Sequence, residues 1–181
     1  MGLIQPIPFY VFICLCAEIL NVVSFNLIGN TIAVGNIFSL LELLILGIII
    51  SSWIENYKQK KYQKIILYLL FIFATTYQLF YGINQIFSEL KMLFSITLIA
   101  ICFIYIVTVS NLFTPNYIGK TIFTIAVTFY FLSNSIIFSF SDYILSESHK
   151  KYWIFYASIH ALTNVIYNIL IAISLYKWKR N

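Results

Sequence analysis

Residues 153–176 read WIFYASIHALTNVIYNILIAISLY, an apolar stretch that carries His160, Asn164 and Asn168 at intervals of four residues. A stretch of about 24 residues is long enough to cross a bilayer as a helix. Because side chains four residues apart lie on the same face of a helix, the three polar groups are predicted to form one ridge. Polar groups inside the hydrocarbon core of a bilayer cost free energy unless they find hydrogen-bond partners. The stretch therefore predicts a membrane helix with a hydrogen-bonded seam.

The composition of the whole chain excludes a soluble domain. Of its 181 residues, 61% are hydrophobic and 9% are charged, and the mean hydropathy is +0.92. Soluble domains carry about 25% charged residues. The net charge of +5 does not come from a basic stripe interleaved with aromatics, so nucleic acid is not an expected partner. The richness in Ile, Phe, Tyr, Asn and Lys is typical of an AT-rich bacterial genome, and we expect a multi-pass protein of the bacterial inner membrane.

Six apolar runs define the predicted fold, and each is close to the roughly 20 residues that cross the hydrocarbon core. They cover residues 8–28, 31–54, 63–82, 90–110, 120–140 and 153–176. The connecting segments are short and leave no room for a soluble catalytic domain on either side. We predict an all-α integral membrane protein, with residues 1–181 forming a single domain, a bundle of six transmembrane helices.

The placement of Lys and Arg predicts the orientation, because cytoplasmic segments of membrane proteins are enriched in both residues. With six spans, most of these residues fall on the side of the two termini: Lys58, Lys60, Lys61, Lys64, Lys120, Lys177, Lys179 and Arg180. Only Lys91, Lys150 and Lys151 fall on the other side. Both termini are therefore predicted to be cytoplasmic.

Further polar residues within the spans extend the ridge into a candidate site for a ligand or a proton. The candidate set is Glu18, Glu42, Gln78, Asn134, His160, Asn164 and Asn168. At a rise of about 1.5 Å per residue, Glu18, Glu42 and Asn164 fall near the midplane, and the other four lie roughly 6 Å to either side. Intramembrane acids cost about 2.5 kcal/mol or more at the centre and normally face the bundle interior. We therefore expect one pocket, with His160 and Glu42 at its core.

These residues also have a purely structural interpretation. Polar side chains of membrane helices commonly hydrogen-bond between helices, for about 0.6 kcal/mol each, and a buried Glu is often simply protonated. Other chemistries lack their residues: no lysine lies mid-span for a Schiff base, and Cys14, Cys16 and Cys102 lack zinc or disulfide spacing. His149 lies in a predicted loop, so the chain lacks a second mid-membrane histidine for a haem. No metal and no cofactor are expected.

Three segments carry a resemblance. Residues 153–170 contain Trp153 followed by the pattern His160-x3-Asn164-x3-Asn168, residues 129–134 read FYFLSN, and residues 38–42 read FSLLE. They resemble the closing, fifth and second helices of a group of small six-helix membrane proteins of Bacteroidota, an uncharacterised family. The resemblance runs from the second span onward and does not include Glu18. It implies that Glu42, Asn134, His160, Asn164 and Asn168 belong together, and it implies no reaction.

The expected function is non-enzymatic: a sensor, permeation element or membrane effector that holds a small ligand, a lipid headgroup or a proton in a polar intramembrane pocket. His160, with an unperturbed pKa near 6.5, would titrate, and Glu42 would be its acidic partner. Asn164 and Asn168 would orient ligand or water, and Glu18 would be a second carboxylate of a proton or cation path.

Two alternatives remain open. The first is an intramembrane enzyme that acts on a lipid-like substrate, with His160 and Glu42 as general acid and base. The second is a structural subunit whose polar seam only holds helices together. The expected partners are the lipid bilayer and either a second copy of the chain or another membrane protein.

Overall fold

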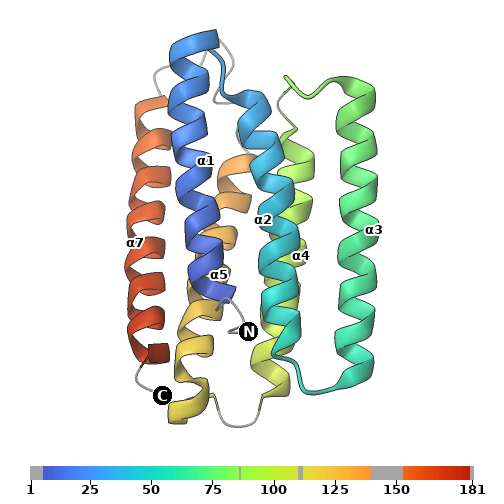
Figure 1. The fold of residues 1–181 in the computed structure, drawn as a ribbon, viewed down its shortest axis with the longest axis vertical. Helices are drawn as coiled ribbons and strands as arrows, with labels where there is room; N and C mark the ends of the chain where they lie inside the picture. Colours follow the sequence, from blue (N-terminus) through green and yellow to red (C-terminus); the bar gives the residue numbers. More distant parts are fainter. Residues whose placement is uncertain (1–5, 86, 110–111, 140–152, 180–181) are drawn as a thin grey trace. The chain divides into compact units, whose positions relative to one another are not determined.

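The computed structural model describes the chain except residues 1–5, 86, 110–111, 140–152 and 180–181. Within the described ranges the long elements are all helices (Figure 1). They are α1 (Pro6–Ile28), α2 (Ile32–Ser52), α3 (Tyr57–Tyr81), α4 (Ser88–Thr108), α5 (Pro115–Ser139) and α7 (Trp153–Lys179). All six are long and apolar enough to cross a membrane. For the described residues, the prediction of an all-helical fold with six such helices is confirmed.

The orientation of the termini stays a prediction. Three of the charges on which it rests, Lys150, Lys151 and Arg180, lie outside the described residues, as does His149.

Helix α3 begins at Tyr57, before the apolar run predicted for residues 63–82, because a polar cap starts it. The side-chain oxygen of Asn56 accepts hydrogen bonds from the backbone N–H groups of Lys58 and Gln59 at 3.0 and 3.3 Å. Lys60 Nζ donates to the carbonyl of Ser52 at 2.7 Å, which satisfies a carbonyl at the end of α2. The helix thus extends through the basic run, and hydropathy marks only its apolar part.

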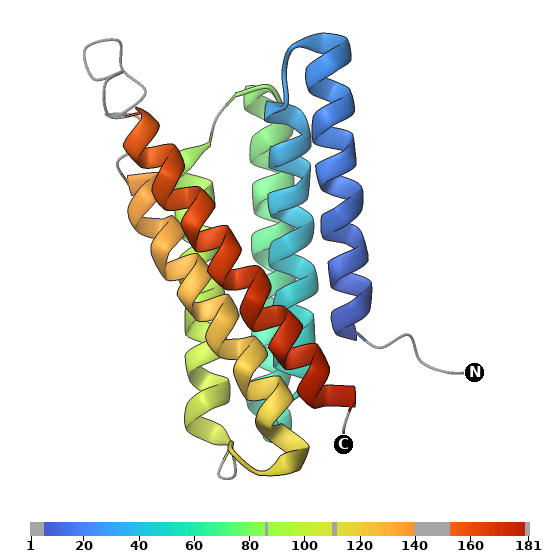
Figure 2. The ribbon, with the colours of Figure 1, turned by 90° about the vertical axis from the view of Figure 1, so that its left-hand side faces the viewer.

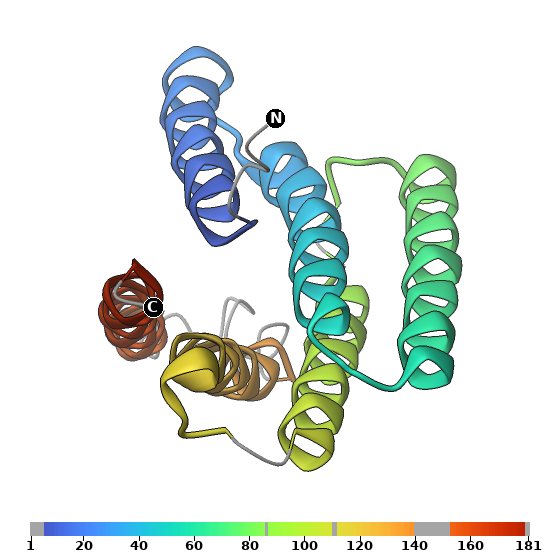
Figure 3. The same cartoon turned by 60° about the horizontal axis from the view of Figure 1, so that its bottom comes forward.

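The chain divides into two compact units, Met1–Phe87 and Ser88–Asn181, and each is described by itself. In the first unit α2 lies between α1 and α3 (Figure 3). In the second unit α5 packs against both α4 and α7, and Figure 2 shows α5 and α7 side by side. A single transmembrane domain would require the two units to pack together. It stays a prediction.

Two contacts set the register between α2 and α3. Ser51 Oγ donates to Gln63 Oε1 at 2.8 Å. One turn further along the pair, Gly47 leaves room for Leu67, because a Cβ on this glycine would lie 2.5 Å from Leu67 Cδ2. Moving four residues back along α2 therefore moves four residues forward along α3, as in an antiparallel pair.

A close approach sets the packing of α5 against α7. Ser174 Oγ donates to the carbonyl oxygen of Gly119 at 2.8 Å. A Cβ on Gly119 would lie 3.2 Å from both the carbonyl oxygen of Ser174 and the backbone nitrogen of Trp178. Further along, the rings of Tyr130 and Tyr167 stack with their centroids 4.5 Å apart. A side chain at position 119 would therefore push against backbone, which cannot rotate away.

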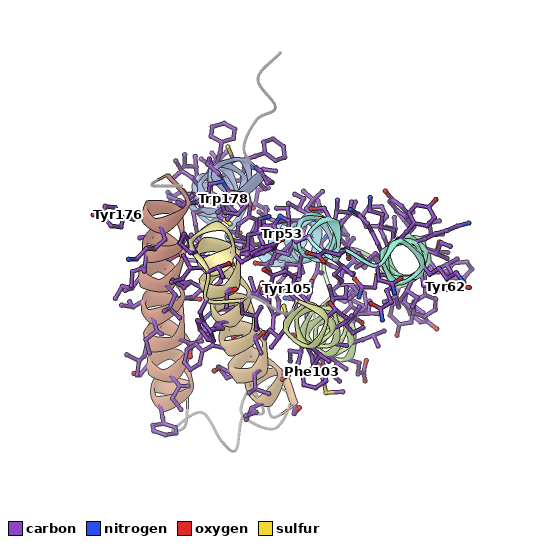
Figure 4. The ribbon with its side chains drawn as sticks, turned by 90° about the horizontal axis from the view of Figure 1, so that it is seen from below. Trp53, Tyr62, Phe103, Tyr105, Tyr176 and Trp178 are labelled. Carbon is purple, nitrogen blue, oxygen red and sulfur yellow. The ribbon has the colours of Figure 1, made fainter. Side chains whose placement is uncertain are left out.

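Large apolar and aromatic side chains remain exposed on the helices. Figure 4 labels Tyr62, Phe103 and Tyr176, which point outward and are 65%, 65% and 55% exposed. Soluble monomers rarely leave extended apolar patches uncovered. These surfaces fit contact with lipid.

Replacing Gly119 by Val is expected to destabilise the protein by about 1–3 kcal/mol, because the new side chain meets the backbone of α7. The matched control is Gly35→Val, since a Cβ on this helical glycine of α2 meets nothing within 4 Å. Thermal unfolding of the detergent-purified protein measures both variants. Equal melting temperatures for the two variants would contradict the close packing of α5 on α7.

Candidate functional site

Two helices of the second unit bring together His160, Asn134 and Asn164, which we term the His160 group. His160 Nδ1 on α7 lies 3.0 Å from Asn134 Oδ1 on α5. Asn164, one turn further along α7, places its Nδ2 at 3.4 Å from His160 Nε2. Asn134 is 1% exposed, whereas His160 and Asn164 are half-buried. Three polar side chains within apolar helices thus form one hydrogen-bonded line.

With the amide oxygen of Asn134 facing the ring, the contacts of the imidazole favour one tautomer. An amide oxygen can only accept, so the contact with Asn134 Oδ1 requires the proton on His160 Nδ1. Nε2 is then free of a proton in the neutral ring and accepts from the Asn164 amide nitrogen. A proton on Nε2 would place the ring N–H against the N–H group of the Asn164 amide, so that two donors face each other. Protonation of the ring therefore requires the Asn164 amide to rotate. The group can therefore register a proton through a side-chain rearrangement.

One atom of this group has no hydrogen-bond partner among the described residues. Asn134 Nδ2 is buried and unpaired. A buried amide donor without a partner costs about 1–3 kcal/mol. An unpaired buried donor of this kind needs an explanation. A bound ligand or water with an acceptor oxygen would supply the missing partner of Asn134 Nδ2.

The third residue of the ridge, Asn168, turns away from the group and is exposed. At about 100° per residue, each step of four residues overshoots a full turn by about 40°, so Asn168 lies about 80° round the helix from His160. The face of α7 that is buried runs instead through Thr163, Tyr167, Ile171 and Ser174. The predicted ridge is therefore divided: His160 and Asn164 lie on the half-buried side of α7, and Asn168 lies on the exposed side.

The two predicted carboxylates lie in the first unit and differ in environment. Tyr10 on α1 donates its hydroxyl proton to Glu42 Oε1 on α2 at 2.7 Å, and both side chains are buried. Glu18 is exposed, since it lies about 100° round α1 from the buried Ala17. Tyr10 as the partner of Glu42 was missed from sequence, because a Tyr near a helix start also fits an interfacial anchor.

Gln78 lies in the first unit as well, opposite a second buried amide, Asn36, that is not among the predicted site residues. Continuing the register from Gly47 and Leu67 by eleven residues, about three turns, places Asn36 of α2 opposite Gln78 of α3. Both are buried, at 0% and 3% exposure. Asn36 could have been found as a polar residue within an apolar span.

Within the second unit the structure brings together the His160 group, and within the first it gives Glu42 and Gln78 different neighbours. The expected pocket with His160 and Glu42 at its core joins both units and stays a prediction. Among the described residues, no three His, Cys, Asp or Glu side chains gather as metal ligands would. A cavity of about 170 Å³ between α1 and α2 has an apolar lining: Ile13, Cys16, Ala17, Leu20, Val34, Ile37, Phe38 and Leu41.

No family model, curated protein or solved structure matches the chain. The resemblance to the six-helix proteins of Bacteroidota stays a prediction.

Nitrogen NMR of the ¹⁵N-histidine-labelled protein is expected to show His160 as the Nδ1–H tautomer at neutral pH, because Nδ1 faces an amide oxygen. A His149→Gln variant assigns the signals, since the chain holds two histidines. Asn134→Leu should remove this preference, whereas Asn168→Leu should leave it unchanged. An Nε2–H tautomer in the unmodified protein would contradict the geometry of the His160 group.

Tyr10→Phe is expected to lower the free energy of unfolding by about 1–3 kcal/mol, because it leaves a buried carboxyl oxygen without its donor. Tyr62→Phe is the control, since this tyrosine is 65% exposed. Glu42→Gln should cost less than Tyr10→Phe because its amide oxygen still accepts the hydroxyl. Thermal unfolding in detergent compares the variants, and an unchanged Tyr10→Phe protein would refute the contact.

Proposed function

We propose that this chain is a non-enzymatic, multi-pass membrane protein in which the His160 group takes a small ligand, a lipid headgroup or a proton. It acts as a sensor, permeation element or membrane effector, and the bacterial inner membrane is its proposed location. The proposal builds on six helices that are long and apolar enough to cross a bilayer.

The observation that carries the proposal is the unpaired Asn134 Nδ2 beside an imidazole that is hydrogen-bonded to the same side chain. A group that served only to hold α5 against α7 would be expected to satisfy all its buried donors. The open donor suits an acceptor oxygen, such as that of a phosphate, carboxylate or water. The imidazole adds a titratable group at the same place.

The roles within the proposal follow from the contacts. His160 is the titratable residue, Asn134 holds its ring and offers the ligand donor, and Asn164 orients the second ring nitrogen. Asn168, on the exposed flank of α7, is expected to contribute least. An intramembrane enzyme would need His160 and Glu42 to act on one substrate, and this pairing stays a prediction.

Native mass spectrometry of the purified protein tests ligand retention, with proton flux into liposomes as the second readout. We expect either a retained small molecule or lipid, or a pH-dependent flux, in the wild type and in Asn168→Leu. The same signal should be lost in Asn134→Leu and in His160→Ala, provided that both variants unfold at temperatures close to the wild type.

Two outcomes would contradict the proposal. One is that neither signal is found in the wild type, which favours a structural subunit. The other is that the membrane lipids of overexpressing cells change chemically in a manner that depends on His160, which favours the enzyme.

A further inference from the structure

We propose a second site, at the end of the α2–α3 pair next to residues 82–85, that binds a small monovalent cation with Asn36 Oδ1 and Gln78 Oε1 as its acceptors. Both oxygens are buried and have no hydrogen-bond partner among the described residues. Both side chains are more than nine-tenths buried. The site lies in the first unit and does not depend on the function proposed for the His160 group.

The orientation of the Asn36 amide follows from its contacts. Its Nδ2 donates to the carbonyl oxygens of Ile83 and Gln85 at 2.8 and 2.7 Å. Rotating the amide by 180° would place Oδ1 against two carbonyl oxygens, so only the orientation with Nδ2 facing them forms hydrogen bonds. Asn36 Oδ1 therefore points away from residues 83 and 85 as a free acceptor.

The position of Gln78 follows from the helix register. The α2–α3 pair carries a comparable glutamine at its other end, where Gln63 Oε1 accepts from Ser51 at 2.8 Å. The same register brings Gln78 opposite Asn36. The register thus places the amide of Gln78 level with that of Asn36. Gln63 Oε1 has a serine partner at the other end of the pair, whereas Gln78 Oε1 has no hydrogen-bond partner among the described residues.

Two neutral oxygens call for a ligand that offers donors or positive charge. Ammonium, a primary amine or an alkali metal ion meets both oxygens at once, and amide oxygens are hard ligands that suit such ions. The same end of α3 carries a cluster of aromatic rings, since the ring centroid of Tyr77 lies 4.5 Å from that of Tyr81 and 5.4 Å from that of Phe87. Ring faces attract cations, and more strongly where water is excluded.

The depth of the site is compatible with charge. Asn36 lies in the second turn of α2 and Gln78 in the last turn of α3. A cation there would lie near the end of both helices, where its cost is far below that at a bilayer centre.

Thermal unfolding of the full-length protein in detergent tests the site by titration with ammonium, methylammonium, sodium and potassium chloride, with choline chloride keeping the ionic strength constant. We expect at least one of the four cations to raise Tm in a saturable manner by about 3 °C or more. A response to ammonium and methylammonium alone assigns an amine site, whereas a response to sodium or potassium assigns an alkali metal site.

Variants locate the response. Gln78→Met keeps the length of the side chain but removes the oxygen, and should abolish the shift. Gln63→Met is the matched control and should keep the shift, because Gln63 Oε1 already accepts a hydrogen bond from Ser51. Gln78→Glu should strengthen the response, since a carboxylate attracts cations more than an amide does.

The proposal is overturned if no cation shifts Tm, which would indicate a bridging water or an amide–amide contact between Asn36 and Gln78. It is equally overturned if the shift persists in Gln78→Met, or if Gln78→Glu weakens it.

Discussion

A polar side chain on an apolar helix must find a partner, either a carbonyl of its own helix, as for Thr124 and Lys120, or a group on a neighbouring helix. The contacts between neighbouring helices are the ones on which the packing of both units depends. Each described helix pair around the candidate residues carries such a contact: Ser51 with Gln63, Tyr10 with Glu42, Ser174 with Gly119, and Asn134 with His160. Apolar surfaces in lipid gain little from facing each other rather than the acyl chains. Directional hydrogen bonds and close glycine contacts therefore set the register, and the apolar side chains fill the space that remains.

The atoms that escape this matching are the informative ones. Among the described residues, the buried donor Asn134 Nδ2 of the second unit has no hydrogen-bond partner, and neither have the acceptors Asn36 Oδ1 and Gln78 Oε1 of the first. Asn21 Oδ1 and Gln63 Nε2 in the first unit are likewise unpaired there. The atoms of the two proposed sites differ in chemistry, since the donor Asn134 Nδ2 suits an acceptor-bearing ligand and the acceptors Asn36 Oδ1 and Gln78 Oε1 suit a cation. The paired Gln63, on the same helix as Gln78, shows that this fold satisfies such an amide oxygen where a serine is at hand.

Local sequence signals were reliable for the helices. Runs of about 20 apolar residues favour helices long enough to cross a membrane, because a helix satisfies its backbone groups within its own segment. Helix α3 begins before the apolar run of residues 63–82, because hydropathy marks the apolar stretch and not the Asn56 cap before it. Within the candidate site, the likeness of residues 129–134 pointed to Asn134, and the structure places it against His160.

The sequence by itself determined the six long apolar helices and the presence of costly polar groups among them, since both depend only on side-chain type and spacing. Only the tertiary structure decided which of these groups meet. The ridge of His160, Asn164 and Asn168 shows why: a helix repeats every 3.6 residues and not every four. The drift sends Asn168 to the exposed flank, while the packing of α5 turns His160 towards Asn134. Spacing along one helix cannot specify the partner that the next helix supplies.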